Sequence, residues 1–166
     1  METIVLAGGC FWGVEAYFKQ LKGITDTTVG YVDGNMRKPT YEMVCSNEAT
    51  HAEAVKVTFD PDVVTLEAVL DHFFRIINPY MRNRQGNDIG RQYRTGIYHT
   101  SETQENRIRA FMTKTFKDEL PRVMTEIKPE HDFDDAEQYH QDYLDKNPFG
   151  YCHVNMGLAK PEEKKR

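Results

Sequence analysis

The sequence predicts an α/β fold, an α+β roll that contains a ferredoxin-like two-layer βαββαβ sandwich and continues into a helical and coil C-terminal extension. Short apolar or alternating runs typical of strands occur four times. Helical apolar stripes separate the first strand from the second and the third from the fourth, and turn residues lie between the elements. This order of elements is that of a split βαβ sandwich.

The sandwich elements follow in order along the chain. Apolar or alternating runs predict strands at residues 3–8, 25–34, 52–59 and 93–99. An apolar stripe that starts at Phe11 predicts a helix that Gly23 stops. A similar stripe predicts a second helix from Leu66 to about Asn78.

The rest of the chain predicts the extension. Ser101 and Gln104 form a capping box for a third helix, which ends before Pro121. A further helix is expected over roughly 135–146. The charged end, KPEEKKR, predicts a flexible tail over about 155–166.

Length and composition limit the function classes. The 166 residues predict one domain over residues 1–166, because no linker or internal repeat divides them. A net charge of −5 without a basic stripe argues against a nucleic-acid partner. No segment approaches the length of a membrane span, and the N-terminus lacks the pattern of a signal peptide. We therefore expect a water-soluble, cytoplasmic monomer.

Cys10 lies at the joint between the first predicted strand and the first predicted helix. Unpaired backbone N–H groups and the helix dipole favour an anion such as a thiolate at that position. A dipole effect of ~0.3 to 2 kcal/mol, at ~1.4 kcal/mol per pKa unit, would lower a thiol pKa near ~8.5 by up to about one unit. The position predicts a nucleophile, but a small buried residue in the turn fits it about equally well.

Two aromatic residues follow this cysteine. Core packing explains Phe11, whereas Trp12, the only tryptophan, lies off the apolar stripe of the helix. An aromatic wall beside a thiol suits a small apolar group such as a thioether methyl. The pair therefore indicates a binding pocket next to Cys10.

Glu53 shares its strand parity with Val55 and Val57, so it should point toward the apolar side of the sheet. Burial raises a carboxyl pKa, and a rise from ~4.3 to about 7 would leave half of the groups protonated. Such a carboxyl is a general acid. At the start of the strand, however, Glu53 could equally turn to solvent.

Three cysteines argue against a secreted disulfide framework and favour a redox or reactive role. Two other function classes stay open. His51 is a candidate base for a Cys–His acyl transferase that uses Cys10. Cys45, His51, Cys152 and His153 are candidate ligands of a metal-binding module, although their spacings match no common zinc pattern.

Several segments resemble the peptide methionine sulfoxide reductase A family. They span nearly the whole chain in the family's order: GCFWG at 9–13 with Glu15, GYVDG at 30–34, YEMVCS at 41–46, HAEAVKVTFDP at 51–61, NRQGNDIGRQYR at 83–94 and AEQYHQDYL at 136–144. The resemblance implies an enzyme that reduces the S epimer of methionine sulfoxide, free or in proteins, and so repairs oxidised proteins. It implies an α/β roll for the fold.

The resemblance also implies roles, position by position. Cys10 would attack the sulfoxide sulfur, Phe11 and Trp12 would form the methyl pocket, and Glu53 would protonate the oxygen. The other matching positions are Tyr41 and Tyr93, which would hydrogen-bond the oxygen, and Asp88, which would help to shape the site. Without the resemblance, these last three residues fit core, surface and turn positions.

Recycling would need a second thiol, since the product at Cys10 is a sulfenic acid. Cys152, in a context that resembles the family's recycling cysteines, would form a disulfide with Cys10. Thioredoxin or another external dithiol would reduce it, with no bound cofactor and no metal. Cys45, in a strand-like YEMVC run, is expected to be structural.

The chain departs from the family in two places. Asn47 and Thr50 stand in a loop before His51 where the family usually has glycines, so the setting of Glu53 could differ. Only one C-terminal recycling cysteine is visible, where some members have two. The chain could also be a domain cut from a fusion with the reductase of the other epimer.

Overall fold

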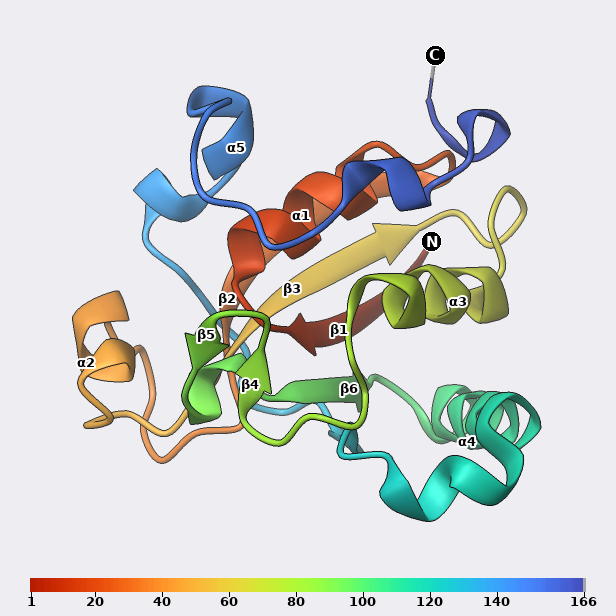
Figure 1. The fold of residues 1–166 in the computed structure, drawn as a ribbon, viewed down its shortest axis with the longest axis horizontal. Coiled ribbons are helices and arrows are strands. Elements are labelled where there is room, and N and C mark those ends of the chain that lie inside the picture. Colours follow the sequence, from red (N-terminus) through yellow and green to blue (C-terminus); the bar gives the residue numbers. More distant parts are fainter. Residues whose placement is uncertain (166) are drawn as a thin grey trace.

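A computed structural model describes residues 1–165 as a mixed α/β fold built on a central sheet (Figure 1). The six strands of this sheet lie in the order β7-β6-β1-β3-β2-β8. Neighbouring strands are antiparallel, except that β6 and β7 are parallel. The strands are β1 (Glu2–Gly8), β2 (Ile24–Val32), β3 (Ala52–Phe59), β6 (Thr95–His99), β7 (Glu126–Pro129) and β8 (Asp134–Asp135).

Five α-helices, five short 3₁₀ helices and a small hairpin are the other elements of the described residues. The α-helices are α1 (Phe11–Lys19), α2 (Tyr41–Cys45), α3 (Leu66–Ile76), α4 (Glu102–Phe116) and α5 (Tyr143–Lys146). The hairpin pairs β4 (Arg84–Gln85) with β5 (Asp88–Ile89) within the polar stretch that follows α3. Side chains cap two of the predicted helices, since Thr65 accepts the Ala68 N–H of α3 and Ser101 accepts the Gln104 N–H of α4.

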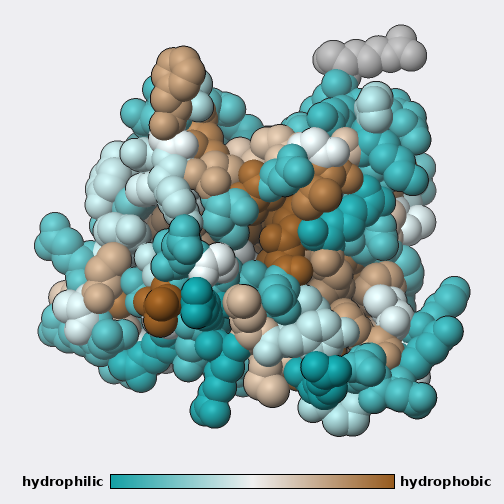
Figure 2. All heavy atoms as spheres, in the orientation of Figure 1, coloured by the Kyte–Doolittle hydropathy of each residue, from teal (hydrophilic) through white to brown (hydrophobic). Residues whose placement is uncertain are grey.

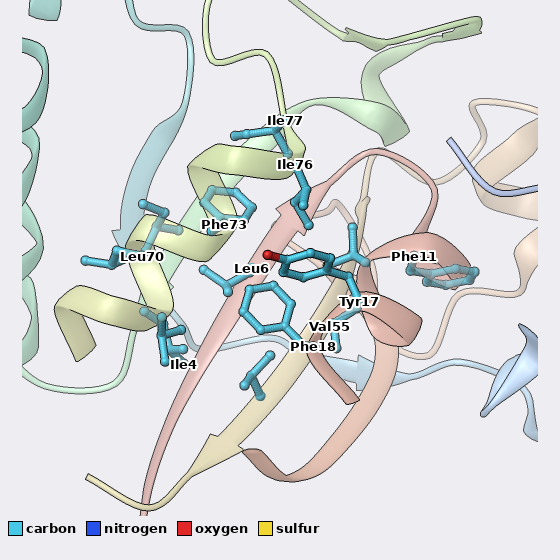
Figure 3. Close-up of a cluster of buried hydrophobic side chains, with 14 of the residues drawn as sticks. Ile4, Leu6, Phe11, Tyr17, Phe18, Val55, Leu70, Phe73, Ile76 and Ile77 are labelled. Atoms are coloured by element: carbon cyan, nitrogen blue, oxygen red, sulfur yellow. The ribbon is translucent and has the colours of Figure 1, made fainter. Parts of the chain in front are cut away.

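The alternation of the strands divides the core between two faces of the sheet. Ile4 and Leu6 of β1 belong to the main core, to which α1 and α3 contribute. Figure 3 shows Phe18 of α1 and Phe73 of α3 meeting beside Leu6. A smaller cluster on the other face contains Val5, Ala7, Val32, Ala52, Ala54 and Tyr98. The four strands and three long helices predicted from these patterns are present.

Two predicted elements differ from the structure, and the extension, predicted as helix and coil, also adds β7 and β8 to the two edges of the sheet. The YEMVC run forms helix α2 and not a strand, because the Thr40 side chain caps it by accepting the Met43 N–H. The helix expected over 135–146 is broken into a 3₁₀ turn and the short α5. It breaks because Asp142 has a left-handed backbone conformation (φ 56°) and the Gln141 side chain bonds the backbone of β2.

The C-terminal segment is packed against the body of the protein and differs from the predicted flexible tail. Residues 155–165 run alongside α1 (Figure 1), and Ala159 is buried. Arg75 of α3 donates two hydrogen bonds to the Glu163 carboxylate, at 2.8 and 2.9 Å. An ion pair between residues 88 positions apart in the sequence thus fixes the segment. The last residue of the predicted tail, 166, lies outside the described residues.

The surface in Figure 2 is mostly hydrophilic, with one band of hydrophobic side chains near its centre. No helix within residues 1–165 has both the length and the apolar character needed to cross a bilayer. The most exposed aromatic side chain within residues 1–165 is that of Phe149, between α5 and Cys152.

Candidate active site

The strand-to-helix joint places Cys10 as predicted, as the N-cap residue of α1. Gly9 makes the turn with a φ of 87°, a conformation that favours glycine. A Cβ at Gly9 would also lie 2.9 Å from the Gln85 side chain, so the turn fits closely under the β4–β5 hairpin. Cys10 is 7% exposed, which leaves its thiol largely shielded from water.

Glu53 lies at this same joint and is 1% exposed, so the burial predicted from strand parity is confirmed. Its Oε1 accepts the Phe11 N–H at 3.3 Å, from the first turn of α1. Its Oε2 is buried and has no hydrogen-bond partner among the described residues. Burial raises the pKa of Glu53 to about 8, so the carboxyl is mostly protonated at pH 7.

The pKa of Cys10 moves opposite to the prediction. Burial of the thiol, and to a smaller extent the charges of Glu53 and Asp88, raise this pKa above its usual range. The backbone N–H groups of Trp12 and Gly13 lower it, as expected at a helix N-terminus, but by less than burial raises it. The prediction counted the dipole alone and was wrong.

Phe11 and Trp12 form an aromatic wall that the C-terminal part of the chain completes. Trp12 stacks on Tyr143, and its Nε1–H donates to the Nδ1 of His140 at 3.0 Å. Phe11 packs against the rings of His140 and Tyr41, with centroids 5.2 and 6.3 Å away. His140 and Tyr143 were not among the predicted site residues, although the AEQYHQDYL segment at 136–144 carries both.

The remaining predicted side chains lie within electrostatic range of Glu53. Tyr41 and Tyr93 are half-buried, and burial followed by the Glu53 charge raises the pKa of each phenol above its usual range. Asp88, on β5, accepts the hydroxyl of Tyr151 at 3.2 Å. Its charge acts on both Cys10 and Glu53. The structure therefore brings the predicted acid, nucleophile and tyrosines to one place.

Cys152 lies over the first turn of α1. A Cβ at Gly13 would lie 3.2 Å from the Cys152 Sγ and 3.3 Å from the His153 Nδ1. A side chain at position 13 would require these atoms to shift by a few tenths of an ångström. Since Gly13 is three residues after Cys10, both cysteines lie at the same end of the helix. All three cysteines, including the exposed Cys45, are free thiols.

The alternative site hypotheses receive no support from the geometry. The ring of His51 is buried, and its Nε2 donates to the Met36 carbonyl at 2.8 Å and not to Cys10. Cys45 accepts a hydrogen bond from the side-chain amide of Gln92. Within residues 1–165, no three His, Cys, Asp or Glu side chains are grouped as metal ligands would be, so the four metal candidates do not come together in one site.

Comparison with known proteins identifies the family. A sequence model described as peptide methionine sulfoxide reductase matches residues 2–166. The chain belongs to the peptide methionine sulfoxide reductase family. It is therefore an oxidoreductase of the MsrA type. The MsrA of Ureaplasma urealyticum is 45% identical over 160 residues, which cover 96% of this chain and 97% of the relative.

Solved structures of Mxr1 share the fold. Reduced Mxr1 from Saccharomyces cerevisiae superposes with a TM-score of 0.85 at 36% identity, covering 96% of this chain and 91% of Mxr1. Mxr1 in complex with Trx2 superposes with a TM-score of 0.60 at 29% identity, covering 86% and 84% of the two chains.

Proposed function

We propose that this protein reduces the S epimer of methionine sulfoxide to methionine, both in oxidised proteins and as the free amino acid. One observation carries the chemistry. Glu53 is buried beside Cys10 and protonated at neutral pH, and its Oε2 has no partner among the described residues. A neutral carboxyl with a free oxygen at a thiol is suited to protonate a sulfoxide oxygen.

In the proposed first step, the Cys10 sulfur attacks the substrate sulfur while Glu53 gives its proton to the sulfoxide oxygen. The positive character that protonation gives the substrate favours a thiolate at Cys10, which offsets the burial that raises the thiol pKa. The oxygen passes to Cys10 as a sulfenic acid, methionine leaves, and the thiol proton restores the Glu53 carboxyl. The substrate sulfur thereby gains the two electrons that Cys10 loses.

Binding is proposed to use the surrounding rings. The aromatic wall of Phe11 and Trp12 offers an apolar contact for the thioether methyl. Tyr41 and Tyr93, on the Glu53 side, are proposed to donate hydrogen bonds to the sulfoxide oxygen, and Asp88 to shape the site.

In the proposed second step, the Cys152 thiol attacks the Cys10 sulfenic acid, a disulfide forms and water leaves. The closeness of Cys152 to the first turn of α1 supports this pairing. An external dithiol, proposed to be thioredoxin, then reduces the disulfide, and no bound cofactor is needed. The complex of the related Mxr1 with Trx2 supports that partner.

The remaining proposals concern the chain as a whole. We propose a monomeric cytoplasmic enzyme in which residues 1–166 form one domain. The order β6-β1-β3-β2, with antiparallel neighbours, supports the ferredoxin-like description of the sheet's centre.

A stoichiometric experiment tests the cycle. Reduced protein is mixed with racemic methionine sulfoxide without thioredoxin, and methionine and free thiols are counted. We expect about one methionine per chain and a disulfide between Cys10 and Cys152, with the R epimer untouched when a dithiol is later added. Cys152→Ser should keep the single methionine but lose thioredoxin-driven turnover, whereas the control Cys45→Ser should keep both. No methionine with three intact thiols would refute the proposal.

A further inference from the structure

The residue after the recycling cysteine, His153, is held at the joint that carries Cys10. Its Nε2 lies 3.0 Å from the carbonyl oxygen of Gly8, the last residue of β1. A Cβ at Gly9 would lie 3.0 Å from the same nitrogen, so the ring lies directly against the turn. The proposed reaction of Cys10, Glu53 and Cys152 gives this histidine no role.

The hydrogen bond to Gly8 fixes the tautomer of the ring. A carbonyl oxygen can only accept, so Nε2 carries the hydrogen and Nδ1 presents a lone pair. This Nδ1 is buried and has no hydrogen-bond partner among residues 1–165. A buried acceptor without a partner costs free energy, so its presence calls for an explanation.

The lone pair lies beside the recycling thiol. The His153 Nδ1 and the Cys152 Sγ both lie within contact distance of one point, the position of a Cβ on Gly13. In this structure the thiol donates to the Val154 carbonyl at 3.3 Å. No hydrogen bond joins this thiol to Nδ1 in the structure, so the Cys152 side chain must change its torsion angles to bring its hydrogen to that nitrogen.

We propose that His153 is the general base of the recycling step and takes the thiol proton of Cys152 through Nδ1. The inference rests on the proposed function. As the proton moves to His153, the Cys152 sulfur attacks the Cys10 sulfur and the S–O bond of the sulfenic acid breaks. The departing hydroxyl group takes the proton from His153 and leaves as water, so the ring returns to its neutral form. A thiol attacks as a thiolate, so this step needs an acceptor for its proton.

The surroundings keep the ring ready to accept a proton. Burial lowers the pKa of His153, more than its bond to Gly8 and the charge of Asp88 raise it, so the ring is neutral at pH 7. The titratable groups that face it are Asp88 on β5 and Cys152 in its own segment. Asp88 is engaged by the Tyr151 hydroxyl.

The variant His153→Gln removes the base but can keep the hydrogen bond to the Gly8 carbonyl. The glutamine side-chain amide can still donate to the Gly8 carbonyl but has no basic lone pair. Reduced protein is given one equivalent of methionine S-sulfoxide, and three quantities are followed in time: methionine, sulfenic acid trapped by a 1,3-diketone, and disulfide. We expect disulfide formation to slow by about tenfold or more, well beyond any slowing of methionine formation.

Two further measurements complete the test. Raising the pH from 7 to 9 should restore most of the lost rate of disulfide formation from the sulfenic acid in His153→Gln, because hydroxide can then take the thiol proton in place of the ring. The control His131→Gln, at an exposed histidine, should behave like the unmodified chain. Three outcomes would refute the role of His153 as a base: equal slowing of methionine and disulfide formation, slowing that a higher pH does not relieve, or no slowing at all. Failure of the unmodified chain to form methionine would instead refute the proposed function.

Discussion

The indole of Trp12 lies face to face with the phenol ring of Tyr143, with ring centroids 3.8 Å apart and planes 10° from parallel. Its Nε1–H is bonded to His140, so one face and one edge of the ring are fixed. Glu15 of α1 holds the partner segment in place by accepting the Asp142 N–H at 2.8 Å, directly before Tyr143. The position of the tryptophan next to Cys10 thus depends on a segment more than 120 residues away.

Tyr143→Ala should loosen this wall. Aromatic pairs contribute about 0.5–1.5 kcal/mol, so we expect the KM for methionine sulfoxide to rise roughly 2- to 10-fold with a smaller change in kcat. Tyr143→Phe keeps the ring and should retain the KM. Since Trp12 is the only tryptophan, its fluorescence reports the same change. An unchanged KM and emission in Tyr143→Ala would show that the stacking does not position Trp12.

Glu53→Gln should abolish the acid while keeping its shape, because the amide oxygen can still accept the Phe11 N–H. We expect kcat/KM to fall by about 10²- to 10⁴-fold. In the unmodified chain, activity should fall as the pH rises through about 8, since the protonated carboxyl is the active form. The variant should lack that transition. A rate profile that falls at pH 8 in both proteins would assign the transition to another group.

The same substitution should change how stability depends on pH. The folded-state pKa of Glu53 is raised from 4.5 to about 8 by burial, so its contribution to stability is complete below about pH 4.5 and is lost as the pH rises toward 8. Glutamine does not titrate. The difference in unfolding free energy, Glu53→Gln minus the unmodified chain, should therefore increase between pH 5 and 8 in urea titrations. A difference independent of pH would contradict the burial of a neutral carboxyl.

Glu163→Gln should free the C-terminal segment. Hydrogen bonds from Arg75 lower the pKa of Glu163 to about 2, so this charge pair stabilises the segment above about pH 4.5 and is lost as the pH falls toward 2. A loss of about 1 kcal/mol would speed amide exchange at Lys22 and Lys165, which bond across this segment, about fivefold at pH 7. Glu162→Gln, a substitution at the exposed neighbouring residue, should leave the exchange rates unchanged. If both substitutions speed exchange equally, the Arg75–Glu163 ion pair does not hold the segment.

The sequence predicted those parts of the site that depend on local spacing. The joint at Cys10 follows from an apolar strand, two glycines and a helical stripe, and the burial of Glu53 follows from strand parity. The helix over 135–146 could not be excluded in this way, because Gln141 breaks it by bonding Val29, 112 residues away. Likewise, the dipole at Cys10 is visible in the sequence, but the desolvation that outweighs it depends on the folded surroundings.

Ion pairs hold the segment that carries Cys152 to the helices, both before and after this residue in the sequence. Before it, Lys19 of α1 forms ion pairs with Asp142 and Asp145, and after it Arg75 binds Glu163. A thiol confined between two such anchors meets its target at a high effective concentration, on the order of millimolar or above for short tethers. In the proposed cycle, a dissolved thiol would have to match that concentration to capture the oxidised Cys10 first. The anchors would then protect the enzyme against mixed disulfides with small cellular thiols.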